Sequence, residues 1–157
     1  MRKLFLFVIF CLMPVLSTVA NETFQPVVKH SQRQKVIQKT FAMIKPSGLS
    51  KTMEIKSIIK SYGLKIIKSK KIIITEKQVD KLYYMHKDKP FYNDLKASLV
   101  GKEVEVMVLY GDHAVNRYRE AVSDIRSKYA INKTENAVHG SDSWRRAHEE
   151  ICIFFEC

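Results

Sequence analysis

The chain has 157 residues, 46% of them hydrophobic and 27% charged, which fits one compact globular domain. With only five glycines and four prolines, and without repeats or low-complexity segments, the sequence excludes a long flexible tract. The formal net charge of +11 is typical of proteins that meet polyanions such as nucleic acid, acidic lipid or small phosphates. The lysines are spread along the chain rather than gathered in one block. A solvated basic face is therefore favoured over a nucleic-acid-binding surface.

Residues 1–20 have the three parts of a secretory signal peptide. Arg2 and Lys3 give a basic start, residues 4–16 are almost wholly apolar, and a polar stretch of small residues ends at Ala20. The apolar stretch is shorter than the ~20 residues that a membrane-spanning helix needs. We therefore expect cleavage near Ala20 and a secreted or periplasmic protein. The alternative is an uncleaved leader that anchors the chain to a membrane.

Residues 21–38 are polar and lack helical or strand periodicity, which predicts a linker before the domain. Near the other end, Cys152 lies in the apolar run 151–155, and this setting predicts a buried free thiol. A bridge from Cys152 to Cys157 would need a sharp return of the chain. The sequence leaves open whether either cysteine forms a disulfide.

The hydrophobic pattern predicts four strands, at residues 40–44, 64–74, 104–110 and 136–139. Helices are expected at residues 51–62, 76–99, 112–122 and 143–155. The second of these is expected to be interrupted around Lys89 and Pro90, because proline disfavours a continuous helix. One face of the last helix is expected to carry Trp144, Ala147, His148 and Ile151.

Strands and helices thus alternate through residues 39–157, and the strands are short. This order predicts an α+β sandwich with segregated helices. The natural candidate is the ferredoxin-like split βαβ arrangement, an antiparallel four-stranded sheet covered by helices.

The segment 136–143 reads Asn-Ala-Val-His-Gly-Ser-Asp-Ser. His139 precedes a glycine and three small polar residues that are able to cap a helix, and free N–H groups at a helix start favour an anion. A histidine changes charge near neutral pH, so it suits a nucleophile or an acid–base group. Taken alone, however, a histidine beside a helix cap is more often structural.

This segment resembles the signature of the nucleoside diphosphate kinase family, N-x-x-H-G-S-D-S. Residues 40–46 (TFAMIKP) are similar to the family's first strand and phosphate-side lysine, and Lys89-Pro90-Phe91-Tyr92 is similar to its nucleotide clamp. The resemblance covers about residues 39 to 155 in the family's order.

The resemblance implies that His139 takes the γ-phosphate of a nucleoside triphosphate and passes it to a nucleoside diphosphate in a ping-pong cycle. Glu150 matches the carboxylate that orients the imidazole, and Ser141 matches the residue that supports this glutamate. Tyr83 matches the tyrosine near the histidine, and Lys45 completes the catalytic set.

The nucleotide-binding residues implied by the resemblance are Lys45, Phe91, Leu95, Arg119, Arg126 and Asn136. Lys45 and the two arginines neutralise phosphates, which is the main task of a phosphoryl-transfer site. Phe91 stacks on the base with Leu95 packed behind it, and Asn136 and Lys45 contact the sugar hydroxyls. Mg²⁺ arrives on the nucleotide phosphates rather than in a protein cage.

Each of these residues also has an ordinary structural interpretation. Lys45 fits an exposed turn, and Phe91 fits a core aromatic. Arg119 and Arg126 fit a solvated basic face. Glu150 fits a helical ion pair with Arg146.

The sequence departs from the family between Arg119 and Arg126, where a long loop is shortened and its phosphate-binding threonine has no counterpart at its place. Ser123 is a candidate substitute, which the sequence alone does not favour. In the family this loop also contacts neighbouring subunits of a hexamer. We therefore expect a dimer or another homo-oligomer smaller than a hexamer.

Two functions are compatible with the sequence: an exported phosphotransferase, or an exported binding module of the same fold that uses its basic surface for nucleic acid or a protein partner. Because the residues implied in catalysis are retained, the enzyme is favoured.

Overall fold

The expected alternation of strands and helices is present in the computed structural model, which describes residues 34–157. The strands are β1 (Ile37–Ile44), β2 (Lys65–Ile73), β3 (Glu103–Asp112) and β4 (Val138–Gly140). The helices are α1 (Thr52–Ser61), α2 (Glu76–Leu82), α3 (Tyr92–Leu99), α4 (Ala114–Tyr129) and α5 (Trp144–Phe154), with short 3-10 turns η1 (Pro46–Lys51) and η2 (Tyr84–His86). The predicted signal peptide, and the predicted linker up to residue 33, lie outside the described residues.

The four strands form one antiparallel sheet in the order β2-β3-β1-β4. Strand β3 lies between β1 and β2, so the β1-α1-β2 unit is split by a strand that comes later in the chain. The predicted ferredoxin-like α+β fold is confirmed. Within residues 34–157, no helix is both long and apolar enough to cross a membrane.

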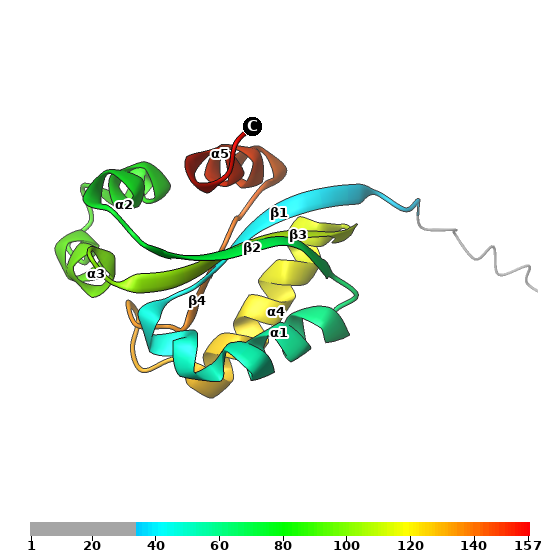
Figure 1. The fold of residues 1–157 in the computed structure, drawn as a ribbon, viewed down its shortest axis with the longest axis horizontal. Coiled ribbons are helices and arrows are strands. Elements are labelled where there is room, and N and C mark those ends of the chain that lie inside the picture. The colour runs from blue at the N-terminus through cyan, green and yellow to red at the C-terminus, as the bar shows by residue number, and fades with distance from the viewer. Residues whose placement is uncertain (1–33) are drawn as a thin grey trace, which may run out of the picture. The chain divides into compact units, whose positions relative to one another are not determined.

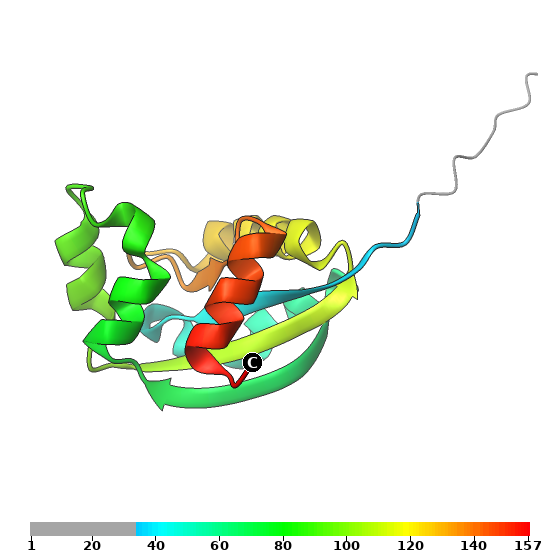
Figure 2. The ribbon, with the colours of Figure 1, turned by 90° about the horizontal axis from the view of Figure 1, so that it is seen from above.

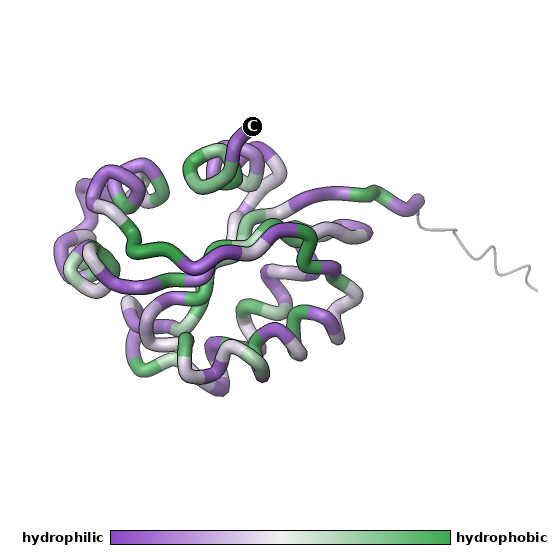
Figure 3. Tube along the Cα trace, in the orientation of Figure 1, coloured by the Kyte–Doolittle hydropathy of each residue, from purple (hydrophilic) through white to green (hydrophobic). Residues whose placement is uncertain are grey.

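Helices cover both faces of this sheet, as Figures 1 and 2 show. On one face Ala42 and Ile44 of β1 pack with α1 and α4. On the other face Phe41 and Met43 pack with residues of α2, α3 and α5. Successive side chains of a strand point to opposite faces, so the part of β1 that is covered on both faces, residues 41–44, is apolar throughout. In Figure 3 the helices alternate along their length between hydrophilic and hydrophobic residues, as expected for one buried side.

Helix α4 is longer than predicted. The expected helix at residues 112–122 continues to Tyr129 and takes up the whole shortened segment between Arg119 and Arg126. The buried residues of α4 repeat with helical spacing along its full length, which explains the continuity. These residues are Ala114, Val115, Tyr118, Ala121, Val122 and Ile125.

Two other predictions differ in detail from the structure. Strand β1 begins at Ile37, inside the segment expected to be linker. The buried face of helix α5 is only partly the predicted one. Ala147 is buried and Ile151 packs against the core as expected, but the other buried residues are Glu150 and Phe154, and Trp144 is 67% exposed. The sequence pattern misplaced this face because a buried glutamate was not counted among its core residues.

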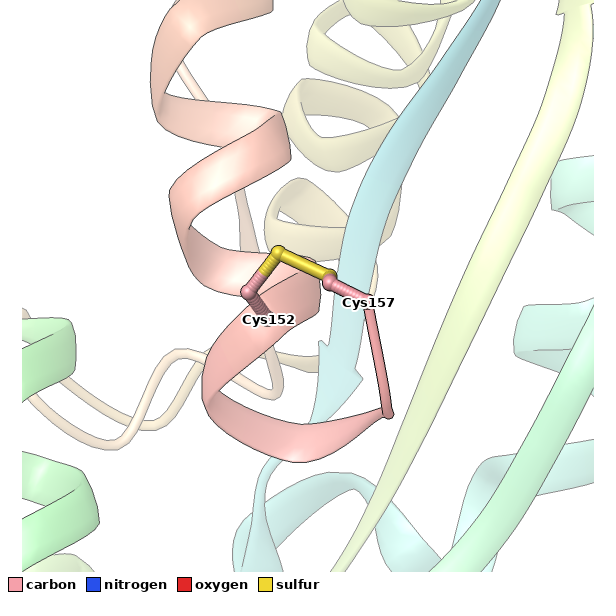
Figure 4. The surroundings of a disulfide bond; sticks show 2 residues. All are labelled: Cys152 and Cys157. Carbon is pink, nitrogen blue, oxygen red and sulfur yellow. A yellow bond between two sulfur atoms is a disulfide. The ribbon is translucent and has the colours of Figure 1, made fainter.

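Cys152 is not a buried free thiol, so that prediction is wrong. It lies on the exposed side of α5 and forms a disulfide with Cys157, five residues further on (Figure 4). The helix ends at Phe154, and the extended backbone of Phe155 turns the chain back, which brings the two Cα atoms to 5.4 Å. That separation is in the usual range for a disulfide. Phe155 packs against the α2, α3 and α5 side of the core.

Replacing Cys157→Ser should lower stability modestly without unfolding the protein. The bridge closes a loop with a sequence separation of only 5, and a loop this short contributes about 2 kcal/mol in the chain-entropy description. We expect the Tm of the variant to fall by roughly 8 °C. Thermal unfolding with and without dithiothreitol checks this: reductant should lower the Tm of the parent protein and leave the variant unchanged. An equal Tm for both proteins would mean that the bridge does not constrain the unfolded chain.

Candidate active site around His139

A cavity of about 260 Å³ opens where the end of β1, strand β4 and helices α2 to α5 meet. Most of the site residues predicted from the sequence line it. They are Lys45, Tyr83, Phe91, Leu95, Arg126, Asn136, His139 and Glu150. Two predicted residues, Ser141 and Arg119, lie beside this cavity and not in its lining.

The short strand β4 aims His139 into the cavity. His139 pairs with Met43 of β1, and its neighbour Val138 packs on the α1 and α4 side of the sheet. Because side chains alternate along a strand, His139 faces the α5 side. Its Nε2 lies 3.2 Å from Oε2 of Glu150, and its ring meets the edge of Tyr83 at 5.1 Å between centroids. His139 lines the cavity, and within residues 34–157 its side-chain hydrogen bond uses Nε2, which leaves Nδ1 without a partner.

Glu150 is 2% exposed, and each of its carboxylate oxygens has a partner. Oε2 accepts a hydrogen bond of 2.6 Å from Ser141 Oγ in addition to its contact with His139, and Oε1 accepts one of 3.1 Å from Arg146 Nη2. The helical ion pair with Arg146 and the contact with the imidazole therefore exist together, one on each oxygen. The two interpretations of Glu150 do not compete.

The backbone after His139 is fixed by a close approach and a helix cap. A Cβ atom at Gly140 would lie 2.6 Å from Cε1 of the buried Tyr118 ring, so only glycine fits there. Three residues later the side chain of Ser143 accepts a hydrogen bond from the backbone N–H of Arg146 at the start of α5. A capping serine satisfies a free donor at a helix N-terminus. The helix start predicted from the small polar residues is confirmed.

Lys45 is buried, with 4% of its surface exposed, so it is not an ordinary turn lysine. Its Nζ donates to Oδ1 of Asn136 at 2.8 Å and to the carbonyl of Thr134 at 3.1 Å. Burial first, and then the positive charge of Arg126, lower the pKa of Lys45 to about 7. Desolvation and a like charge both disfavour the charged form of a lysine. The ammonium group is therefore held where an anion would stabilise it.

The two predicted phosphate arginines occupy different positions. Arg126 lines the cavity and donates through Nε and Nη2 to the carbonyl of Val138, at 3.3 and 3.0 Å. Arg119 lines an adjoining groove, where its Nη1 donates to the carbonyl of Asp142 at 3.0 Å. The guanidinium groups thus follow one another along α4, with only Arg126 at the cavity itself.

The outer part of the cavity carries aromatic side chains. Phe91 is 44% exposed, which excludes the interpretation of a core aromatic, and its ring lies 5.6 Å from that of His86. Leu95 is buried one turn of helix later. The cavity therefore has a flat apolar surface, provided by the exposed ring, and a charged surface, provided by the cations.

Sequence reasoning missed several lining residues, among them His86 and Asp142. Asp142 belongs to the signature segment, which could have marked it. For His86 the sequence offers no signal, because the turn η2 that brings it to the cavity depends on tertiary packing. Arg146 was considered only as an ion-pair partner. It lines the cavity and also donates from Nη2 to the carbonyl of Leu82 at 2.9 Å.

This fold and this cavity define a split βαβ protein with a histidine-centred cleft. A family model described as nucleoside diphosphate kinase matches residues 38–157. A nucleoside diphosphate kinase of Wolbachia pipientis from Culex pipiens is 39% identical over 134 residues, covering 77% of this chain and 96% of the relative. One from Caulobacter sp. strain K31 is 36% identical over 131 residues, covering 76% and 94%. The chain belongs to the nucleoside diphosphate kinase family.

Solved structures agree with this assignment. The nucleoside diphosphate kinase of Aquifex aeolicus superposes with a TM-score of 0.71 at 27% identity, covering 77% of this chain and 96% of that one. A nucleoside diphosphate kinase family protein from Babesia bovis gives a TM-score of 0.70 at 30% identity, covering 76% and 88%. The similarity therefore extends over nearly the full length of each relative.

The lowered pKa of Lys45 predicts how substrate capture depends on pH. As pH rises through about 7, the free protein loses the Lys45 cation, so kcat/KM for an anionic nucleotide should fall. In Lys45→Arg the side chain stays charged, and this fall should disappear whatever the absolute activity. Profiles of kcat/KM between pH 6 and pH 9 for both proteins check this. The same fall in the variant would assign it to another group.

Proposed function

We propose that this chain is a nucleoside diphosphate kinase that works through a phosphorylated His139. Nδ1 of His139 attacks the γ-phosphorus of a nucleoside triphosphate, the bond from that phosphorus to the β,γ-bridging oxygen breaks, and the diphosphate leaves with the bonding electrons. An acceptor diphosphate then attacks the phosphohistidine and regenerates the imidazole. The observation that carries this proposal is the hydrogen-bonded chain from His139 through Glu150 to Ser141 at the wall of a cationic cavity.

Glu150 is the positioning residue of this mechanism. By accepting a hydrogen bond from the Nε2–H group, its carboxylate selects the tautomer in which Nδ1 carries the lone pair, and it stabilises the positive charge that the ring gains during attack. Ser141 and Arg146 keep the carboxylate in place. The side chain of Tyr83 is buried against the imidazole, and burial raises the pKa of its phenol, which stays neutral beside the reacting ring.

The cations of the site suit the phosphates of a nucleotide, and the exposed aromatic ring suits its base. Lys45 and Arg126 supply the charge that phosphoryl transfer requires, and Arg119 extends it along α4. Asn136, already bonded to Lys45, is placed to meet a sugar hydroxyl. The exposed ring of Phe91 offers a stacking surface that suits every base, because each base has a π-face.

Mg²⁺ fits this cleft as part of the nucleotide. Among residues 34–157, no three His, Cys, Asp or Glu side chains are close enough together to hold a metal ion. Asp142 is the acidic lining residue free to face an ion or its water shell, since both oxygens of Glu150 are engaged. A bound ion would help to neutralise the phosphate charge.

The alternative, a non-catalytic binding module, has less support. A module that only binds phosphates does not need a buried carboxylate to orient a histidine. The lysines of the outer strand β2 also have a simpler explanation than nucleic acid, because charges on an edge strand prevent unwanted pairing with another sheet. Export of the enzyme by residues 1–20 is part of our proposal, and mass spectrometry of the N-terminus in the native host tests it.

Replacing His139→Asn should abolish phosphate exchange and leave the fold intact, because the amide keeps a polar group near Glu150 but removes the nucleophilic nitrogen. Incubation with γ-labelled ATP should give an acid-labile, base-stable label on the parent protein and none on the variant. Circular dichroism and Tm serve as the folding control. Retained exchange in the variant would show that His139 is not the nucleophile.

We also expect a homodimer, or another assembly smaller than a hexamer. The segment that supports hexamer contacts in the family is here part of helix α4, which leaves no loop to extend toward a neighbour. Sedimentation equilibrium at micromolar protein measures the assembly directly. A hexamer that persists on dilution would show that other surfaces carry it.

A further inference from the structure

Helix α4 places three polar side chains on one face. Arg119, Ser123 and Arg126 are related by spacings of i, i+4 and i+7, and α4 is continuous through all three. Residues at these spacings lie on the same side of an α-helix. Ser123 is therefore held between the two arginines.

These side chains line a groove of about 340 Å³ beside the His139 cavity. The other lining residues are Val122, Gly140, Ser141 and Asp142. Arg126, Gly140 and Asp142 also line the cavity, so the two spaces adjoin. An anion at His139 would therefore extend naturally toward the face of α4.

The hydroxyl of Ser123 is exposed and is not hydrogen-bonded to any residue between 34 and 157. Two other helical serines differ from Ser123 in this respect. Ser98 and Ser127 each donate to the backbone carbonyl three residues earlier, at 2.7 Å. Ser123 is free to donate to a ligand. Both neighbouring guanidiniums also keep unused N–H donors, because a guanidinium has five and these are bonded through one or two nitrogens to single carbonyls.

We infer that Ser123 is a phosphate ligand. Resting on the function proposed above, this inference places the phosphate chain of a nucleoside di- or triphosphate over the α4 face, where Ser123 donates a hydrogen bond to a phosphate oxygen between Arg119 and Arg126. A hydrogen bond to a charged acceptor is stronger than a neutral one. A hydroxyl at this position in the helix thus supplies a phosphate contact in place of the shortened loop.

The variant Ser123→Ala tests this directly. Alanine favours an exposed helical position, so the variant should fold. We expect its KM for the nucleoside diphosphate to rise about tenfold with little change in kcat, because a phosphate contact formed equally in ground and transition states affects binding alone. Ser123→Thr keeps the hydroxyl and should stay within about threefold of the parent. Ser127→Ala, an exposed serine of the same helix outside the groove, is the matched control and should leave KM unchanged.

A binding measurement separates this inference from the proposed function. Inorganic tripolyphosphate is the probe, because it carries the phosphate chain without sugar or base and needs no catalysis. Calorimetry should show about tenfold weaker binding to Ser123→Ala than to the parent, with adenosine binding unaffected. Equal tripolyphosphate affinity in the parent, Ser123→Ala and Ser127→Ala would overturn the role of Ser123. A parent protein that binds tripolyphosphate but takes no label from γ-labelled ATP would overturn the proposed function and leave the Ser123 result standing.

Discussion

The buried carboxylate of Glu150 is the group on which the rest of the site depends. A carboxylate that is only 2% exposed is costly unless its oxygens are bonded, and removing one partner of a buried pair typically costs about 3–5 kcal/mol. Its partners come from β4, from the turn after β4 and from α5 itself, and through Arg146 the network reaches the carbonyl of Leu82 in α2. The charge of one side chain thereby fixes the relative positions of three elements and the orientation of His139.

The second constraint is a tightly packed backbone beside His139. Ala137 has a φ of 64°, a left-handed conformation that is uncommon for a residue with a Cβ, and its carbonyl accepts a hydrogen bond from the N–H of Lys45 at 2.8 Å. A Cβ atom at Gly48 would lie 2.6 Å from that same carbonyl oxygen. Such strained residues persist where the surroundings hold them and tend to occur at functional sites. Here the strained turn connects the buried Lys45 to the strand that carries His139.

The sequence predicted the elements well where hydrophobic periodicity was strong, as in β1, β3 and α1. It predicted the site through an eight-residue signature, since physical reasoning on His139 alone did not distinguish nucleophile from helix cap. It could not predict the disulfide of Cys152, because apolar neighbours in sequence do not show which side of α5 faces solvent. Nor could it show that Lys45 is buried, a property created by Asn136 and Thr134 from a distant segment.

The continuity of α4 explains how the site keeps its charge after losing a loop. Seven residues separate Arg119 from Arg126, which is close to two full turns of helix, so both guanidiniums point the same way. One residue more or less would rotate Arg126 by about 100° and take it out of the cavity. Keeping Arg126 at the cavity is electrostatically unfavourable, because its positive charge repels the Lys45 ammonium group and helps to lower the pKa of Lys45. Without a substrate, these cations are close together and only partly compensated. On the proposed function, a polyphosphate would relieve this repulsion on binding, so the same crowding that destabilises the empty cleft would favour a bound anion.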